Sequence, residues 1–147
     1  MFKAVEVAHY FLCQLDAEAG DLISNLKLQK LLYYAQGFHL ALNNAPLFEE
    51  SIEAWTHGPV VVEAYHHFKE YSSDAIPCPV GFDFSTFDTE TSELLDEVYA
   101  VYGQFSAWKL REMTHEESPW IETPARQAIS HDAMKQYFQT QLASENV

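Results

Sequence analysis

The sequence predicts a mainly α-helical fold: a compact single-domain bundle of about six helices with one or two short extended strands. The chain has 147 residues, the usual size of one domain. Hydrophobic residues make up 48% of it and aromatic residues 14%, enough for one core. Apolar residues recur at helical spacing, and turn-forming residues separate the periodic segments. We therefore expect a single domain over residues 1–147.

The first two helices are expected to include the central one. Residues 2–15 are too apolar for a surface helix and suit a helix packed on several sides, which ends before Gly20. Ser24 or Asn25 can cap a second helix that runs to about Leu42. Apolar side chains occupy two adjacent faces of this second helix, so we expect it at the centre of the bundle.

A short strand and a helix that begins at a Gly-Pro step are expected next. Residues 48–55 alternate in part between apolar and polar and predict one strand. Gly58 precedes Pro59, whose fixed φ suits the first turn of a helix, and this third helix is expected to end near Tyr71. The backbone N–H groups of such a helix start could hold an anion or an acidic side chain, but a turn that only reverses the chain explains the pair equally well.

The second half of the sequence predicts a loop and three more helices. Residues 72–88 contain Pro and Gly and are expected to form a loop with at most one short extended stretch. Because a helix should end before Pro119, residues 115–120 are expected to be irregular. The expected helices run from Asp88 or Thr89 to Gly103, from Ser106 to about Thr114, and over about 130–143.

The charge of the chain is strongly acidic. There are 22 acidic and 8 basic residues, a formal net charge of −14, and residues 70–108 hold eight acids with no Lys or Arg. Such a surface repels phosphates, so direct binding of nucleic acid is not expected. Two interpretations stay open: a solvated surface, or a surface that steers a basic partner.

No enzyme, cofactor or metal motif is present. The five glycines are too far apart for a phosphate-binding loop, no pair of histidines has the spacing of helical metal ligands, and no serine lies in a nucleophile elbow. Cys78 between two prolines is a weak candidate nucleophile. We therefore expect neither catalysis nor a cofactor.

Location is predicted from three features. No stretch is long and apolar enough for a membrane span, and no signal peptide is recognisable. Cys13 and Cys78 lie in neither a metal motif nor a disulfide framework, and so free cysteines in a reducing cytoplasm are expected.

Three segments combine residues that a plain core does not require. They are 27–37 (KLQKLLYYAQG), 53–60 (EAWTHGPV) and 110–120 (LREMTHEESPW). Core packing explains the first well, because tyrosine rings and lysine stems cover apolar surface. The second has a large aromatic anchor beside a turn, and the third needs side-chain bonds to hold an irregular segment.

Within and beside these segments, residues 28–37, then 46–48 leading to 53–61 with Tyr65 one turn later, and finally 114–120 resemble in this order the Panacea domain, a SocA-like or GepA-like phage-associated family. The resemblance covers about residues 5–130. The resemblance implies a compact helical antitoxin that neutralises a cognate protein toxin, encoded by an adjacent gene, by direct binding. It also leaves open a proteolytic adaptor that delivers the toxin to a cellular protease. An acidic decoy for a basic nucleic-acid-binding protein is a further alternative. The candidate partner-binding residues are Lys30, Tyr34, Trp55, His57, Gly58, Pro59, Tyr65, Thr114, His115 and Trp120.

Overall fold

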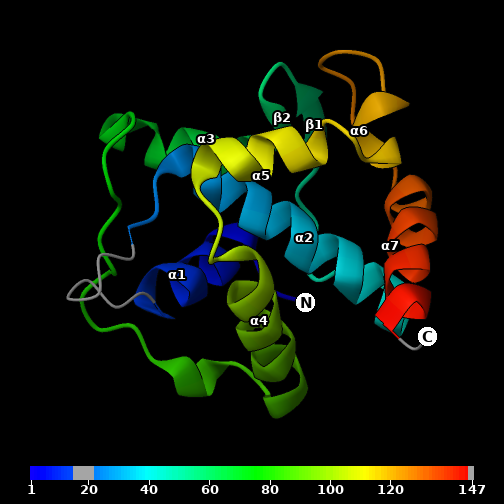
Figure 1. Ribbon diagram of the computed structural model, residues 1–147. Coiled ribbons are helices and arrows are strands. Elements are labelled where there is room, and N and C mark those ends of the chain that lie inside the picture. The colour runs from blue at the N-terminus through cyan, green and yellow to red at the C-terminus, as the bar shows by residue number, and fades with distance from the viewer. Residues whose placement is uncertain (15–21, 146–147) are drawn as a thin grey trace.

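The computed structural model describes residues 1–14 and 22–145, with the backbone alone for 143–145, and confirms the mainly α-helical prediction. Within these residues there are seven α-helices and one two-stranded sheet (Figure 1). The elements are α1 (Ala4–Gln14), α2 (Asn25–Asn43), β1 (Ile52–Trp55), β2 (Gly58–Val61), α3 (Val62–Phe68), α4 (Thr89–Tyr102), α5 (Ala107–Thr114), α6 (Ser118–Ile121) and α7 (His131–Glu145), with short 3-10 turns η2 (Lys69–Tyr71) and η3 (Phe84–Thr86). No helix of the described residues is long and apolar enough to cross a membrane.

Helix α2 is the central helix, as its apolar faces predict. It runs through the middle of the molecule, with α5 and the β1–β2 hairpin on one side, α1 and α4 on the other, and α7 along its C-terminal half (Figure 1). Thirteen of its 19 residues are buried, so it contacts most other elements. The Ser24 side chain accepts a hydrogen bond from the Lys27 backbone N–H at its start. Asn44 ends it in the left-handed conformation, with φ 55°.

A missing side chain lets α7 approach α2. A Cβ atom at Gly37 would lie 2.1 Å from the Phe138 ring, which is fully buried. Glycine at this position therefore allows the phenylalanine to pack directly on the backbone of α2.

Buried polar side chains of α2 fasten the chain around it. The Gln29 Oε1 atom accepts the Val61 backbone N–H at 3.0 Å. Gln36 accepts from the Leu47 N–H at 2.7 Å and donates to the Phe48 carbonyl at 2.8 Å. These bonds satisfy backbone groups that would otherwise be buried without partners, and so they fix both ends of the segment that carries the hairpin.

The prediction of a helix that begins at Gly58-Pro59 is wrong, because these residues form strand β2. Gly58 pairs with Trp55 and Pro59 with Ala54 in an antiparallel hairpin closed by residues 56–57. Gly58 takes φ +109°, and all four β2 residues are buried. Burial of this apolar face and cross-strand pairing outweigh the preference of proline for a first helical turn. The helix starts at Val62 instead, so of the two interpretations of the Gly-Pro pair the chain-reversing turn is the one that this structure supports.

Two smaller expectations also change. Pro119 does not leave residues 115–120 wholly irregular, because it occupies the first turn of the short helix α6, where a missing N–H costs nothing. In the loop over 72–88, residues 84–86 form η3, since the Asp83 carboxylate accepts the Ser85 N–H at 2.9 Å and closes a turn.

The two cysteines are joined by a disulfide, which corrects the expectation that they are free. Cys13 at the end of α1 bonds to Cys78 in the loop that precedes η3, 65 residues later. The loop is held beside it by a hydrogen bond from the Ile76 N–H to the Ile23 carbonyl at 2.9 Å. A bonded Cys78 is not a free nucleophile, and the support that free thiols gave to a reducing compartment is withdrawn.

Removal of the disulfide is expected to lower the free energy of unfolding by about 2 to 4 kcal/mol, because the bond closes a long loop in the unfolded chain. The measurement is urea unfolding of the oxidised protein, with and without dithiothreitol. The Cys13→Ser/Cys78→Ser variant is the control, and its curve should not respond to the reductant. Equal midpoints for the oxidised wild type and the double variant would contradict this expectation.

Candidate functional site

The three sequence segments meet around the β1–β2 hairpin. The middle of α2 lies beneath the hairpin, and α5 and α6 lie beside it (Figure 1). The site therefore has a buried layer between α2 and the hairpin and an exposed layer on the outer side of the hairpin and α5.

Lys30, Gly58 and Thr114 form the centre of the buried layer. The Lys30 ammonium donates to the Pro59 carbonyl at 3.0 Å, and its side chain is fully buried. A Cβ atom at Gly58 would lie 2.7 Å from Thr114 Oγ1 and 2.8 Å from Lys30 Cε. Glycine is thus required where the hairpin, α2 and α5 come into contact.

The buried lysine has an unusual titration. Burial lowers the pKa of Lys30 from 10.5 to about 7, and the positive charge of nearby Arg111 adds to the effect. Among the described residues it has no carboxylate partner within ion-pairing distance, and its hydrogen-bond acceptor is a neutral carbonyl. Near neutral pH the side chain is therefore poised between its charged and neutral forms.

Glu117 forms a second buried polar group, between α5 and α6. Its two carboxylate oxygens accept hydrogen bonds from Tyr33 at 2.9 Å and Tyr34 at 2.8 Å. Burial raises its pKa to about 7, while the tyrosine hydroxyls partly oppose the shift. The tyrosine pair of α2 thus positions the turn that leads into α6.

Replacing Glu117 with Gln is expected to remove part of the pH dependence of stability. The raised pKa means that the folded state keeps a proton between pH 4.5 and 7 that the unfolded state has lost, so stability falls as pH rises through this window. The fall amounts to about 3 kcal/mol. Urea unfolding at several pH values should show it in wild type and in the exposed neighbour variant Glu116→Gln. An equal fall in Glu117→Gln would refute the assignment.

Helix α6 is fastened to the hairpin by aromatic side chains. The Trp120 indole N–H donates to the Trp55 carbonyl at 2.8 Å. The His115 ring stacks on Trp120, with centroids 4.0 Å apart and planes 14° apart. Burial, with a smaller contribution from Arg111, lowers the pKa of His115 and favours its neutral form. These residues fix the position of the hairpin from the side of α6.

The exposed layer pairs aromatic rings with guanidinium groups. Arg126 lies 4.3 Å above the Trp55 ring, which also meets Tyr65 edge to face at 5.1 Å. Arg111 lies 4.4 Å above the Trp108 ring and donates through Nε to His57 Nδ1 at 2.9 Å. Trp108 is 55% exposed although it is one of the largest apolar side chains of the protein. Such contacts hold amphipathic side chains in one arrangement at the surface.

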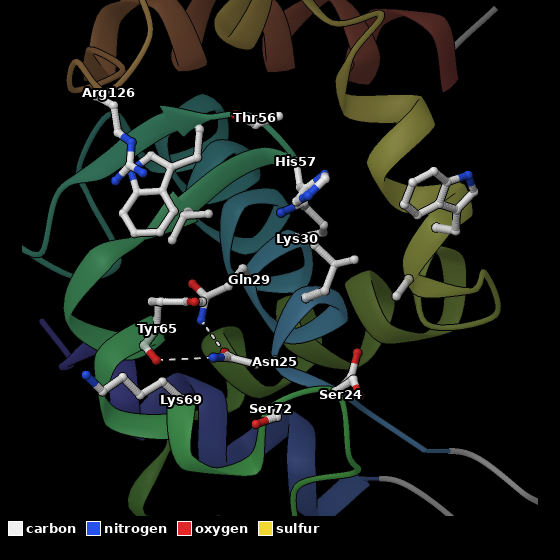
Figure 2. Close-up of a pocket in the computed structure, with 16 residues that line it drawn as sticks. Ser24, Asn25, Gln29, Lys30, Thr56, His57, Tyr65, Lys69, Ser72 and Arg126 are labelled. Atoms are coloured by element: carbon white, nitrogen blue, oxygen red, sulfur yellow. Dashed lines mark hydrogen bonds between the residues drawn. The ribbon is translucent and has the colours of Figure 1, made fainter.

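A pocket of about 960 Å³ opens between these two aromatic groups (Figure 2). Its floor is the first half of α2, with Asn25 and Gln29 in hydrogen-bond contact with each other. The hairpin forms one wall and α5 the other, while Lys69 and Ser72 lie at the end nearest η2. A pocket of this size is large enough for a ligand or for side chains of a partner protein.

All ten predicted residues lie in or beside this arrangement, but they differ in exposure. Tyr34 stacks on Tyr102 in the interior, with centroids 3.8 Å apart. Lys30, Tyr34, Gly58, Pro59 and Thr114 are buried, Trp55, Tyr65, His115 and Trp120 are partly buried, and His57 is exposed. The five buried residues can hold a binding surface in place, but their own side chains are not accessible to a partner.

Five residues of the site were not predicted. They are Lys69, Trp108, Arg111, Glu117 and Arg126. The sequence held a signal for Trp108, since it is a tryptophan in the first turn of a short helix that also carries Lys109, Arg111 and Glu112. Among the described residues there is no group of three or more His, Cys, Asp or Glu side chains that could hold a metal ion.

Comparison with known proteins matches the part of the chain that carries these segments, although Arg126 lies outside the matched residues. A family model described as "Antitoxin SocA-like, Panacea domain" matches residues 28–121, from α2 to the end of α6. The chain is also similar to Antitoxin SocA of Caulobacter vibrioides (strain NA1000 / CB15N), with 49% identity over 53 residues. That match covers 35% of this chain and only 28% of the relative. No solved structure matches the chain.

Proposed function

The chain belongs to the SocA-like Panacea domain family, and from this membership and the geometry of its site we propose that it is an antitoxin that neutralises a protein toxin by direct binding. The observation that carries the proposal is the exposed layer, where Trp55, Trp108 and Arg126 lie on a buried polar framework. Tryptophan, tyrosine and arginine dominate the energy of protein interfaces. Because the buried polar residues hold these side chains in place before a partner arrives, less conformational entropy is lost on binding.

The charge of the surface supports a basic toxin. All eight acids in residues 70–108 are exposed: Glu70, Asp74, Asp83, Asp88, Glu90, Glu93, Asp96 and Glu97. Complementary charge speeds association, and salt screens it. The association rate with the toxin should therefore fall as salt rises, and a rate independent of salt would remove the steering role.

Co-expression tests the function directly. The protein is expressed with each small open reading frame next to its gene, and growth and co-purification are scored. Rescue of growth together with a stable complex is the expected result. No toxicity from any neighbour would contradict the proposal. Toxin levels that fall only when a host protease is present would indicate the adaptor mechanism instead.

Two variants, at side chains of similar exposure, test whether the toxin contacts the surface around the pocket. Trp108→Ala, at 55% exposure on α5, is expected to weaken rescue and the complex. Leu42→Ala, at 56% exposure near the C-terminal end of α2, is the control and should rescue growth like wild type. Equal rescue by both variants would move the contact surface away from the pocket.

A further inference from the structure

The pocket has the opposite charge from the rest of the protein. The chain carries 22 acidic and 8 basic residues, yet the described residues that line the pocket include Lys30, Lys69 and Arg126 and no Asp or Glu. The N-terminal ends of α2 and α5 also line it, and helix N-termini are partially positive. The Glu53 carboxylate lies behind this lining, where it accepts the Trp55 indole N–H at 2.9 Å. A pocket lined by basic residues in so acidic a protein needs an explanation beyond solubility.

The cations enter the pocket from separate walls. Figure 2 shows Arg126 beside the hairpin at one end, Lys69 at the η2 end, and Lys30 on α2, to the right of both in this view. Lys30 is fully covered, so it acts on the pocket through its field and not by contact. Arg126 and Lys69 are exposed, and no described residue accepts a hydrogen bond from either side chain. Both are therefore available to an incoming anion.

We propose that this pocket binds an extended acidic segment of the partner protein, a local exception on a partner whose surface is otherwise basic. Carboxylates of the segment pair with Arg126 at one end and Lys69 at the other, and its apolar atoms pack between Trp55 and Trp108. Bidentate pairing of a guanidinium with a carboxylate is among the stronger polar contacts. The statement that this segment belongs to the toxin rests on the proposed function. The preference of the pocket for an acidic peptide does not depend on that function.

The spread of the charges favours a segment over a small anion. A single carboxylate or phosphate would be met by one of the exposed cations, while the other would stay unpaired at the far end of the pocket. An extended peptide advances about 3.3 Å per residue, so several residues can carry carboxylates to both ends. The aromatic walls add contacts that a small hydrated anion does not use.

The test uses fluorescein-labelled hexaglutamate and its neutral counterpart hexaglutamine, with fluorescence anisotropy at low salt. Hexaglutamate is expected to bind despite the net charge of the protein, and hexaglutamine is not. Citrate is the competitor that represents small anions, and it should displace the peptide only at much higher concentration. Failure of hexaglutamate to bind, or citrate binding as tightly as the peptide, would overturn the proposal.

Matched charge reversals locate the site. Lys69→Glu/Arg126→Glu and Lys3→Glu/Lys135→Glu each change the net charge by −4, since each reversal contributes −2. The first pair should weaken hexaglutamate binding at least tenfold, and the second pair, away from the pocket, less than twofold. Lys69→Gln/Arg126→Gln should give an intermediate loss, and thermal unfolding checks that each variant is folded. Equal weakening by both reversal pairs would show a general charge effect and overturn the proposal.

The two proposals fail separately. The peptide titration contains no toxin, so loss of peptide binding leaves the antitoxin function untouched. Conversely, an absence of toxic neighbours together with tight peptide binding removes the antitoxin function and keeps the pocket.

Discussion

Replacing Lys30 with Met is expected to stabilise the protein by about 3 kcal/mol at pH 7, even though it removes a native hydrogen bond. The lysine is fully buried, and burial lowers its pKa from 10.5 to about 7. At neutral pH the unfolded state keeps the proton that the folded state binds weakly, and this difference opposes folding. Methionine has a similar length without a charge, so it removes this cost and loses only the bond to Pro59.

The pH profile tests the cause. For wild type, the unfolded state binds more protons than the folded state between pH 7 and 10.5, so stability rises with pH across this window. From pH 7 to 9.5, below the ordinary range of tyrosine titration, the rise should be about 3 kcal/mol. The Lys30→Met profile should be flat there and should meet that of wild type near the upper end.

Urea unfolding at a series of pH values measures both profiles. Lys135→Met, on α7 away from the site, is the control and should follow wild type. A variant that is less stable than wild type at pH 7 would show that the ammonium is stabilised where it lies. The presence of a lysine at position 30 would then be explained by its contribution to stability. If the lysine instead lowers the free energy of unfolding, its presence points to a role in the pocket.

Helix starts could be predicted from the sequence because their signals are local. Ser106 caps its helix as predicted, and of the alternatives Ser24 or Asn25 and Asp88 or Thr89 the structure has Ser24 and Asp88 as the caps. Each of these side chains accepts a backbone N–H three residues later. The central position of α2 also followed from its apolar faces, since a helix that is apolar on more than one side needs several neighbours.

The hairpin and the disulfide depend on tertiary contacts that local signals do not contain. Pro59 satisfies a helix start and a strand equally well within its own segment. The choice is made by the fit of Gly58 against Lys30 and by the bond between Val61 and Gln29, which is a contact across 32 residues. Pairing of two cysteines 65 residues apart likewise requires the fold to be known.

The candidate site was predicted as a set of motifs, but its division into layers was not. Lys30 and Thr114 appear as polar side chains in the sequence, and only the packing shows that they are buried. Arg126 and Lys69 lie outside the motif segments, Arg126 in the connection between α6 and α7 and Lys69 in η2, and the fold brings both to the pocket. Glu117 lay within a motif, yet its tyrosine partners are more than 80 residues away in the chain.

Gly58→Ala is expected to lower the free energy of unfolding by about 3 to 5 kcal/mol, from backbone strain and overpacking together. Gly58 has φ +109°, which side-chain-bearing residues rarely adopt. The new methyl group would also lie 2.7 Å from Thr114 Oγ1 and 2.8 Å from Lys30 Cε. Relief of either clash moves the hairpin away from α2 or α5, so binding at the pocket should weaken as well.

Gly81→Ala separates the two causes. Gly81 has φ +83°, but nothing lies within 4 Å of the position of its added Cβ atom. This variant should therefore show the backbone strain alone, about 1 kcal/mol, without a packing penalty. Thr114→Ala in the Gly58→Ala background removes one contact and should recover part of the loss. If Gly58→Ala and Gly81→Ala unfold at the same urea concentration, the contact of the hairpin with Lys30 and Thr114 is not what requires glycine, and the framework beneath the pocket is looser than these distances imply.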